Sequence, residues 1–341
     1  MNEIREVNFM TKYIINRCKK YTWLMLLITL VWTLSTMCSQ YIYKFIGFVI
    51  DYGLNYSGKP YDGEFLFLFN GTFGGYGTLT LVITLAGCVV LFALVSYIMG
   101  YLSSYLQMRG QHLIANGYRV EIYNKSKRKK MPFKSGDFII LLQEDIYQPG
   151  NIFISYYSGM LNNLFSTILT LMMLSNISPY LLITPLALTP LLIYFTIRYN
   201  KQIYNENRVY RSIDGELKNS INNATATKEI NNFDIFKSVN VRHTKERIQL
   251  SHVKSNNNVI LNLIKLAIYI ISCTVAGVLA IKGKILIGEY LIFTAFINTI
   301  YSQILSFINY IITIKSTYPR IEKVRELMEE HLNEASKKAT N

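Results

Sequence analysis

The sequence predicts an all-α membrane protein with six transmembrane helices that extend into the cytoplasm. Of the 341 residues, 51% are hydrophobic and only 16% are charged, a combination that is rare in soluble domains. The hydrophobic residues gather in runs of about twenty or more, the length that spans a bilayer. Six runs are found, at residues 21–50, 79–106, 153–177, 180–197, 259–281 and 290–314.

The first run, residues 21–50, is expected to remain as a membrane helix. It is much longer than the roughly 7–15 apolar residues of a signal peptide, and no small-x-small cleavage pattern precedes Asp51. Residues 1–20 are expected to form a cytoplasmic segment with an interfacial helix, and residues 21–318 the transmembrane domain.

The basic residues set the expected orientation. Most of the 35 Lys and Arg lie in the two termini and in two long loops between runs. The exceptions are Lys59, Lys282 and Lys284 in the outer loops and Lys44, Lys265 and Lys315 in or beside the runs. By the positive-inside rule, both termini and both long loops are cytoplasmic. The net charge of +14 then reflects topology, and no nucleic-acid partner is expected.

Cysteines and histidines are not expected to form a metal or redox centre. The four cysteines lie in or beside apolar runs without CxxC spacing, and the four histidines are scattered through polar regions. Frequent Ile, Asn, Lys and Tyr are typical of an AT-rich bacterial genome, which would place this multi-pass chain in a bacterial plasma membrane.

The two long cytoplasmic loops, residues 107–150 and 198–258, are expected to be helical. Loops of that length without structure are uncommon. In the second loop, apolar residues recur with the spacing of one helical face, namely Ile203, Tyr210, Ile213, Leu217 and Ile221. Runs two to five are therefore predicted to continue as helices well beyond the membrane.

A short transverse segment is expected where each helix pair reverses. In residues 131–138, Pro132 breaks the preceding helix and Gly136 allows a turn. Residues 223–236 form an amphipathic stretch in which Ile230 and Phe233 share one side. Such segments suit a helix-in-groove contact with a cytoplasmic partner, and packing against their own helices is an equal alternative.

Four motifs in these regions occur in a familiar order. The first comprises Ile122-Tyr123, Met131-Pro132-Phe133, Ser135-Gly136-Asp137 and Asp145, and the second comprises Glu216 followed by residues 226–233. The third is residues 283–290, and the fourth is Arg320-Ile321. Together they resemble the transmembrane domain of ATP-binding-cassette (ABC) exporters of the six-helix, domain-swapped type, over residues from about 10 to 330. The spacing from Tyr123 to Gly136 is shorter than usual in that family, and Ala226 and Asn231 replace its Gly and Lys.

The resemblance implies that two coupling helices seat in nucleotide-binding domains. The residues concerned are Met131, Pro132, Phe133, Lys134, Ser135 and Gly136, and Ala224, Thr227, Lys228, Glu229, Ile230 and Phe233. The chain would then be the transmembrane subunit or domain of an exporter, completed by an identical or different transmembrane subunit. ATP and Mg²⁺ would be held by the partner domain. The alternative is a non-pumping regulator or channel module built on exporter-like helices.

A phosphate-binding loop is missing from the sequence. Gly277 and Gly283-Lys284 come closest, but Ile285 follows where Ser or Thr is needed. No catalytic or metal-binding residue is therefore expected, and ATP-driven translocation would require the partner. Residues 319–341 are expected to form a cytoplasmic tail or a linker towards a nucleotide-binding domain, on a separate chain or in a longer one.

Polar residues form a stripe in the last run and another in the first. The last-run stripe contains Thr294, Asn298, Ser302, Ser306, Asn309, Thr313 and Ser316, and the first-run stripe contains Thr29, Thr33, Thr36, Gln40 and Lys44. Because polar side chains rarely face lipid, both stripes are expected to line a substrate pathway. The residues assigned to that pathway are Thr33, Gln40, Lys44, Asn298, Ser302, Ser306 and Asn309.

Two alternatives stay open for these stripes. Hydroxyls bond back to their own helix carbonyls and amides join neighbouring helices in many membrane proteins. Lys44 would either attract an anionic substrate group, snorkel towards the outer surface, or pair with Asp51 two turns onward. No Asp or Glu lies well inside any run, which argues against a relay of protons between carboxylates.

Overall fold

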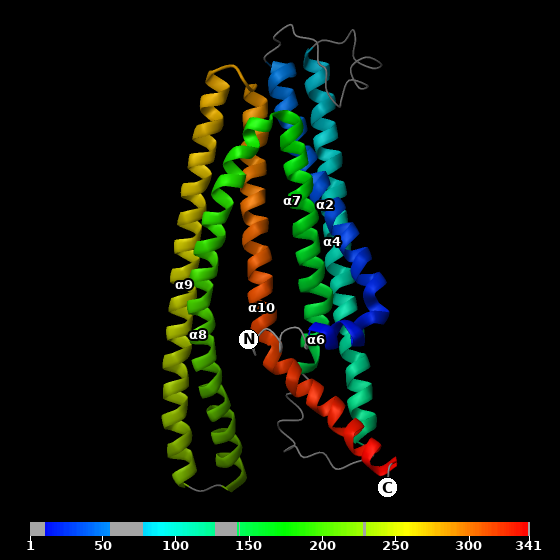
Figure 1. The fold of residues 1–341 in the computed structure, drawn as a ribbon, viewed down its shortest axis with the longest axis vertical. Helices are drawn as coiled ribbons and strands as arrows, with labels where there is room; N and C mark the ends of the chain where they lie inside the picture. Colours follow the sequence, from blue (N-terminus) through cyan, green and yellow to red (C-terminus); the bar gives the residue numbers. More distant parts are fainter. Residues whose placement is uncertain (1–10, 55–77, 127–141, 143, 228–229, 340–341) are drawn as a thin grey trace.

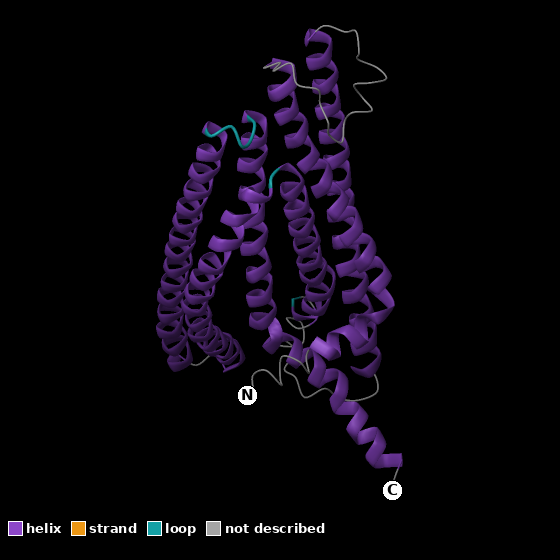
Figure 2. Ribbon diagram, turned by 45° about the horizontal axis from the view of Figure 1, so that its top comes forward, coloured by secondary structure: helices purple, strands orange, loops and turns teal. Residues whose placement is uncertain are grey.

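The computed structural model describes residues 11–54, 78–126, 142, 144–227 and 230–339. These residues are helical apart from short turns, and none of them is in a strand (Figure 2). Six helical segments are long and apolar enough to cross a membrane: Thr11–Asp51, Val82–Asn124, Asp145–Ile177, Pro179–Ile221, Phe233–Ile281 and Ile287–Tyr318. Each overlaps one predicted run, so the predicted all-α architecture with six helices long and apolar enough to cross a membrane is confirmed.

Four helices are much longer than a bilayer is thick. They are α4 (Thr78–Ser126), α8 (Ile183–Thr227), α9 (Ile230–Ile281) and α10 (Ile287–Ala339). At 1.5 Å per residue each is roughly 65–80 Å long, against about 30 Å for the hydrocarbon core. The continuation predicted for runs two, four and five is therefore confirmed, and the last run also continues.

The third run is less regular. The segments η3 (Asp145–Tyr147), α6 (Gln148–Gly150) and η4 (Asn151–Tyr156) lead into α7 (Tyr157–Ile177), and η5 (Pro179–Leu182) connects α7 to α8. Pro149 cannot donate a backbone hydrogen bond, so a regular helix does not continue back through it. Among the described residues, the continuation predicted for this run reaches back only as far as Asp145.

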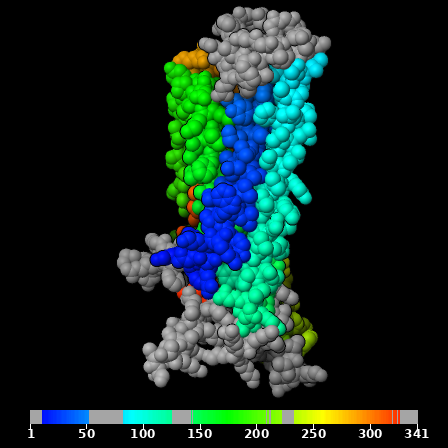
Figure 3. Space-filling view, turned by 90° about the vertical axis from the view of Figure 1, so that its right-hand side faces the viewer, coloured from blue at the N-terminus to red at the C-terminus, as the bar shows by residue number. Residues whose placement is uncertain are grey.

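The N-terminal segment lies across the lower end of the bundle. Residues 11–18 are helical, as expected, and η1 (Lys19–Tyr21) joins them to α2 (Thr22–Phe48) and η2 (Val49–Leu54). Figure 3 shows this segment against α4. Ile14 and Cys18 are fully buried in a cluster with residues of α4 and α10, which fixes the segment to both helices.

The helices form two groups joined by α10. Helices α8 and α9 lie side by side along their length, and α10 stands between this pair and α2, α4 and α7 (Figure 1). Phe293, Phe296 and Tyr301 of α10 are fully buried and form the centre of the upper apolar cluster. The lower part of α8/α9, residues 198–227 and 230–258, is termed the stalk. It contacts α10 at its upper end, where Asn200 bonds Asn309, and extends apart from α10 below that point (Figure 1).

One expectation about the stalk is corrected by the structure. Residues 223–227 complete α8 and residues 230–236 begin α9, so the described residues form no separate transverse helix there. No Gly or Pro occurs from Glu216 to Phe236, so nothing in the sequence breaks the helices before they reach the reversal. The other predicted transverse segment, residues 131–138, lies outside the described residues, as do Lys228 and Glu229.

Candidate functional site

The polar stripe of α2 is covered by α7. The Thr33 hydroxyl donates to Asn162 Oδ1 at 3.2 Å, and Gln40 Nε2 donates to Thr170 Oγ1 at 2.6 Å. Gln40 is only 2% exposed. Within this chain, the first stripe therefore joins two helices, as in the alternative interpretation of the sequence.

This α2–α7 seam is not fully satisfied by its own hydrogen bonds. The hydroxyls of Thr170 and Ser166 donate to carbonyl oxygens one turn earlier in α7. Gln40 Oε1 and Asn163 Nδ2 are buried without a hydrogen-bond partner in the described part of the chain. Because leaving a buried polar atom unpaired costs free energy, these amides lower the stability of the seam relative to apolar side chains of similar size.

Lys44 lies one turn beyond Gln40 and is also covered. It is 8% exposed, and its ammonium group is 5.4 Å from the centre of the Tyr41 ring. The low exposure disfavours snorkelling. Asp51 accepts a hydrogen bond from the Gly288 backbone at the start of α10, so this carboxylate is engaged with another helix.

The polar stripe of α10 is open, in contrast to that of α2. Asn298 and Asn309 are exposed, and Ser302 and Ser306 are half-buried. The Ser302 hydroxyl donates to the Asn298 carbonyl at 2.8 Å, and Asn309 Oδ1 accepts from Asn200 of α8 at 3.3 Å. This stripe therefore leaves the Asn298 side chain exposed, and Asn309 lies at the edge of α8.

Lys265 of α9 joins the open stripe and was not among the residues predicted for the pathway. Its ammonium group donates to Ser302 Oγ at 2.7 Å. A signal for it exists in the sequence, because Lys44 and Lys265 are the charged residues inside the six runs. Only packing reveals that Lys265 reaches the stripe of another helix.

The opposite side of α10 is closed by α7. Thr167 donates to Gln303 Oε1 at 2.8 Å, and Gln303 is 8% exposed. Further down, the Tyr310 ring lies directly over Gly159, where a Cβ atom would come within 2.7 Å of the ring. α10 thus has one face packed on α7 and another open beside Lys265.

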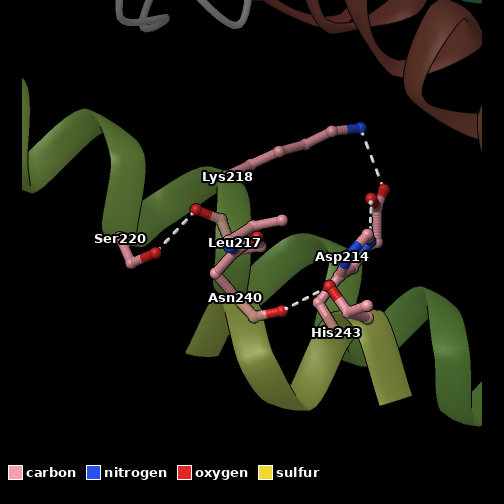
Figure 4. Close-up of polar contacts among 7 residues, drawn as sticks. Asp214, Leu217, Lys218, Ser220, Asn240 and His243 are labelled. Atoms are coloured by element: carbon pink, nitrogen blue, oxygen red, sulfur yellow. Dashed lines mark hydrogen bonds and ion pairs between the residues drawn. The ribbon is translucent and has the colours of Figure 1, made fainter. Parts of the chain in front are cut away.

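Polar contacts hold the two stalk helices together (Figure 4). Asp214 Oδ1 of α8 is 3.2 Å from His243 Nε2 of α9, and Lys218 Nζ is 3.0 Å from Asp214 Oδ2. Burial acts to raise the pKa of Asp214, but the hydrogen bonds from Lys218 and His243 outweigh it and leave this pKa lowered. Arg242 of α9 also pairs with Glu216 of α8 at 3.3 Å.

The predicted coupling residues that the structure describes lie near the tip of the stalk. Phe233 is 61% exposed, and its ring is 6.1 Å from that of Phe236. Ala224 and Thr227 fall in the last turns of α8, and Ile230 begins α9. Residues 131–136, Lys228 and Glu229 lie outside the described residues.

Comparison with protein-family models and with curated proteins finds no match for this chain. The chain is therefore defined by its architecture. It is an all-α protein with six helices that could cross a membrane, consistent with a multi-pass membrane protein. Within the described ranges, no group of three or more His, Cys, Asp and Glu could hold a metal ion.

Proposed function

We propose that this chain is the transmembrane subunit or domain of an ABC exporter. It would form the substrate pathway and couple ATP binding and hydrolysis in a partner domain to alternating access. The single observation that carries the proposal is the stalk, a pair of helices that continues far beyond the bilayer and ends at the segment resembling a coupling helix. A regulator without a partner below the membrane has no evident need for such an extension.

The stalk is suited to transmitting a displacement. Contacts between Asp214 and His243 and between Glu216 and Arg242 fix α8 against α9, so the two helices would move as one body. Higher up, both helices pack on α10, whose open stripe is contacted by α9 through Lys265. A push at the tip would thus reach the stripe through rigid elements, which suits a switch between two global states.

The surface of the stalk also suits protein partners. Large apolar side chains that are more than half exposed include Phe233, Ile235, Val241 and Ile248. These side chains would supply apolar contact area to a partner protein. We assign the tip to a nucleotide-binding domain holding ATP and Mg²⁺, and the flanks to a second transmembrane subunit, identical or different. Both termini would be cytoplasmic and the membrane a bacterial plasma membrane.

Cross-linking in membranes tests the proposal. Cysteine at Phe233 or at Phe133 is expected to cross-link to a nucleotide-binding protein, with both substitutions made in a chain lacking its four native cysteines. Cysteine at Ile281 is the matched control, because this residue is 88% exposed at the opposite end of α9. If neither Phe233→Cys nor Phe133→Cys cross-links in a well-expressed chain, the regulator or channel module becomes the better assignment.

A further inference from the structure

Two charged residues lie inside the six apolar runs, and both are lysines. Lys44 lies near the outer end of the first run, and Lys265 lies in the fifth run, roughly 9 Å above its cytoplasmic end at 1.5 Å per residue. Carboxylates are absent from these runs. The interior of the membrane domain therefore carries positive charge that its own runs do not neutralise.

Lys265 lies beside the polar stripe of α10. The Ser302 hydroxyl of α10 is its hydrogen-bond partner, and no carboxylate pairs with it in the described ranges. Lys44, in contrast, is buried beside an aromatic ring. Because a lysine inside a membrane is costly, one that faces an open polar stripe without a counter-ion points to a ligand that supplies the missing charge.

The neighbours of Lys265 complete a small donor set. Ser302 hydrogen-bonds the Asn298 carbonyl one turn away, and the Asn298 side chain is exposed beside it. Residues four apart on a helix are about 5–6 Å apart, so the ammonium group, which the Ser302 oxygen holds in place, and the Asn298 amide can reach one small group together. An ammonium group with a neighbouring amide N–H donor matches the oxygens of a carboxylate, phosphate or sulfonate.

We propose that Lys265, Ser302 and Asn298 form a binding site for an oxyanion group of the transported solute. The inference rests on the proposed function, since the solute would reach this stripe through the pathway. It assigns the substrate class as anionic, or as a larger molecule with one anionic group. Lys265 is the residue that selects the charge, and Ser302 positions its ammonium group.

The rates at which a cysteine reacts with charged thiol reagents report the electrostatic potential at this site. The full chain, with Cys18, Cys38, Cys88 and Cys273 replaced by Ala and Asn298→Cys added, is placed in phosphatidylcholine vesicles. The introduced cysteine is allowed to react with sulfonatoethyl methanethiosulfonate, which is anionic, and with trimethylammonioethyl methanethiosulfonate, which is cationic. The two rates of modification are then compared. We expect the ratio of anionic to cationic rate to fall about tenfold in Lys265→Gln, as one nearby charge is lost.

Two variants control this measurement. Lys265→Arg retains the charge and should retain the ratio. Lys315→Gln removes an exposed lysine from the same helix as the probe, roughly 25 Å away along α10, and should leave the ratio unchanged. If both reagents modify the cysteine and Lys265→Gln leaves the ratio of their rates unchanged, the anion site is overturned while the pathway stays in place. Modification by neither reagent shows a stripe closed to water, and that result overturns the pathway itself.

The source of the anion is tested in the same system. Inorganic phosphate added to phosphatidylcholine vesicles should slow the sulfonate reagent in the chain with Lys265 and not in Lys265→Gln. If the sulfonate reagent is slowed only when phosphatidylglycerol is included in the vesicles, the occupant is a lipid headgroup. That result would overturn the assignment to a solute.

Discussion

Asp51 and Gly288 join the end of the first transmembrane helix to the start of the last. Asp51 Oδ1 accepts a hydrogen bond of 2.6 Å from the Gly288 backbone N–H, where α10 has unsatisfied donors and the positive end of its dipole. The backbones meet closely here, since a Cβ atom at Gly288 would collide with the Gly47 carbonyl oxygen. The helices that carry the two polar stripes are thus tied together at the end of the bundle opposite the tip of the stalk (Figure 1).

Gly288→Ala is expected to destabilise the protein by separating α2 from α10. Forcing atoms into a tight contact typically costs about 1–3 kcal/mol, and here the obstacle is backbone and a capping carboxylate. Thermal unfolding in detergent should show a lower midpoint. Gly87→Ala in α4 is the control, because a Cβ atom there meets nothing within 4 Å. Equal midpoints for Gly288→Ala and the unsubstituted protein would contradict the close contact.

Gln40→Leu is expected to leave stability unchanged or to raise it. The substitution removes the amide donor to Thr170 but also the buried, unpaired Oε1 atom, whose desolvation costs about 1–3 kcal/mol. The Thr170 hydroxyl keeps its bond to the Ser166 carbonyl. Unfolding midpoints of Gln40→Leu and the unsubstituted protein, measured in the same detergent, provide the test. A clear loss of stability would mean that the whole Gln40 amide is paired.

Asn298→Leu should separate function from folding in the complex. Asn298 is exposed on the open stripe and its side chain is not part of the α2–α7 seam, so assembly and thermal midpoint should be unchanged. Under the proposed function, substrate-stimulated ATPase activity of the assembled complex should change, several-fold if the amide contacts the solute with a net energy of about 1 kcal/mol. Thr294→Val, at the outer end of the same stripe, serves as the comparison. Unchanged stimulation in Asn298→Leu would leave this amide without a role in transport.

Asp214→Asn is expected to weaken the stalk only while Asp214 is ionised. Its pKa is lowered in the folded state, so the stabilisation is present above its ordinary value of 3.8 and is lost as pH falls through the lower folded value. The side chain is about a third exposed, so the effect at pH 7 should be at most about 1 kcal/mol.

Thermal unfolding of Asp214→Asn and the unsubstituted protein at several pH values checks this dependence. The difference in midpoint should be present at pH 5, where Asp214 is ionised, and should vanish in strong acid, where it is protonated. Glu216→Gln is the matched control, because its ion pair with Arg242 is more exposed and should matter less. A difference that persists in strong acid would contradict the assigned sign.

Much of the architecture could be predicted because it depends on local composition. Run lengths identify six spans, and the spacing from Ile203 to Ile221 identifies the stalk helix. The prediction of a transverse helix at residues 223–236 was wrong for the described residues. An amphipathic pattern does not reveal the direction in which a helix runs, and no helix breaker lies in this stretch. Lys265 was passed over as a pathway residue because a lysine at one position gives no periodic signal.

By itself, the sequence determined that this chain has six apolar helices, two of which carry polar stripes, because run length and helical period are properties of neighbouring residues. Only the tertiary structure decided which stripe is covered. Gln40 is buried against Thr170 of α7 and Thr33 bonds Asn162 of the same helix, whereas Asn298 is exposed one turn from Ser302, the partner of Lys265 of α9. The two stripes have the same pattern, and the difference arises from which distant helix packs against each of them.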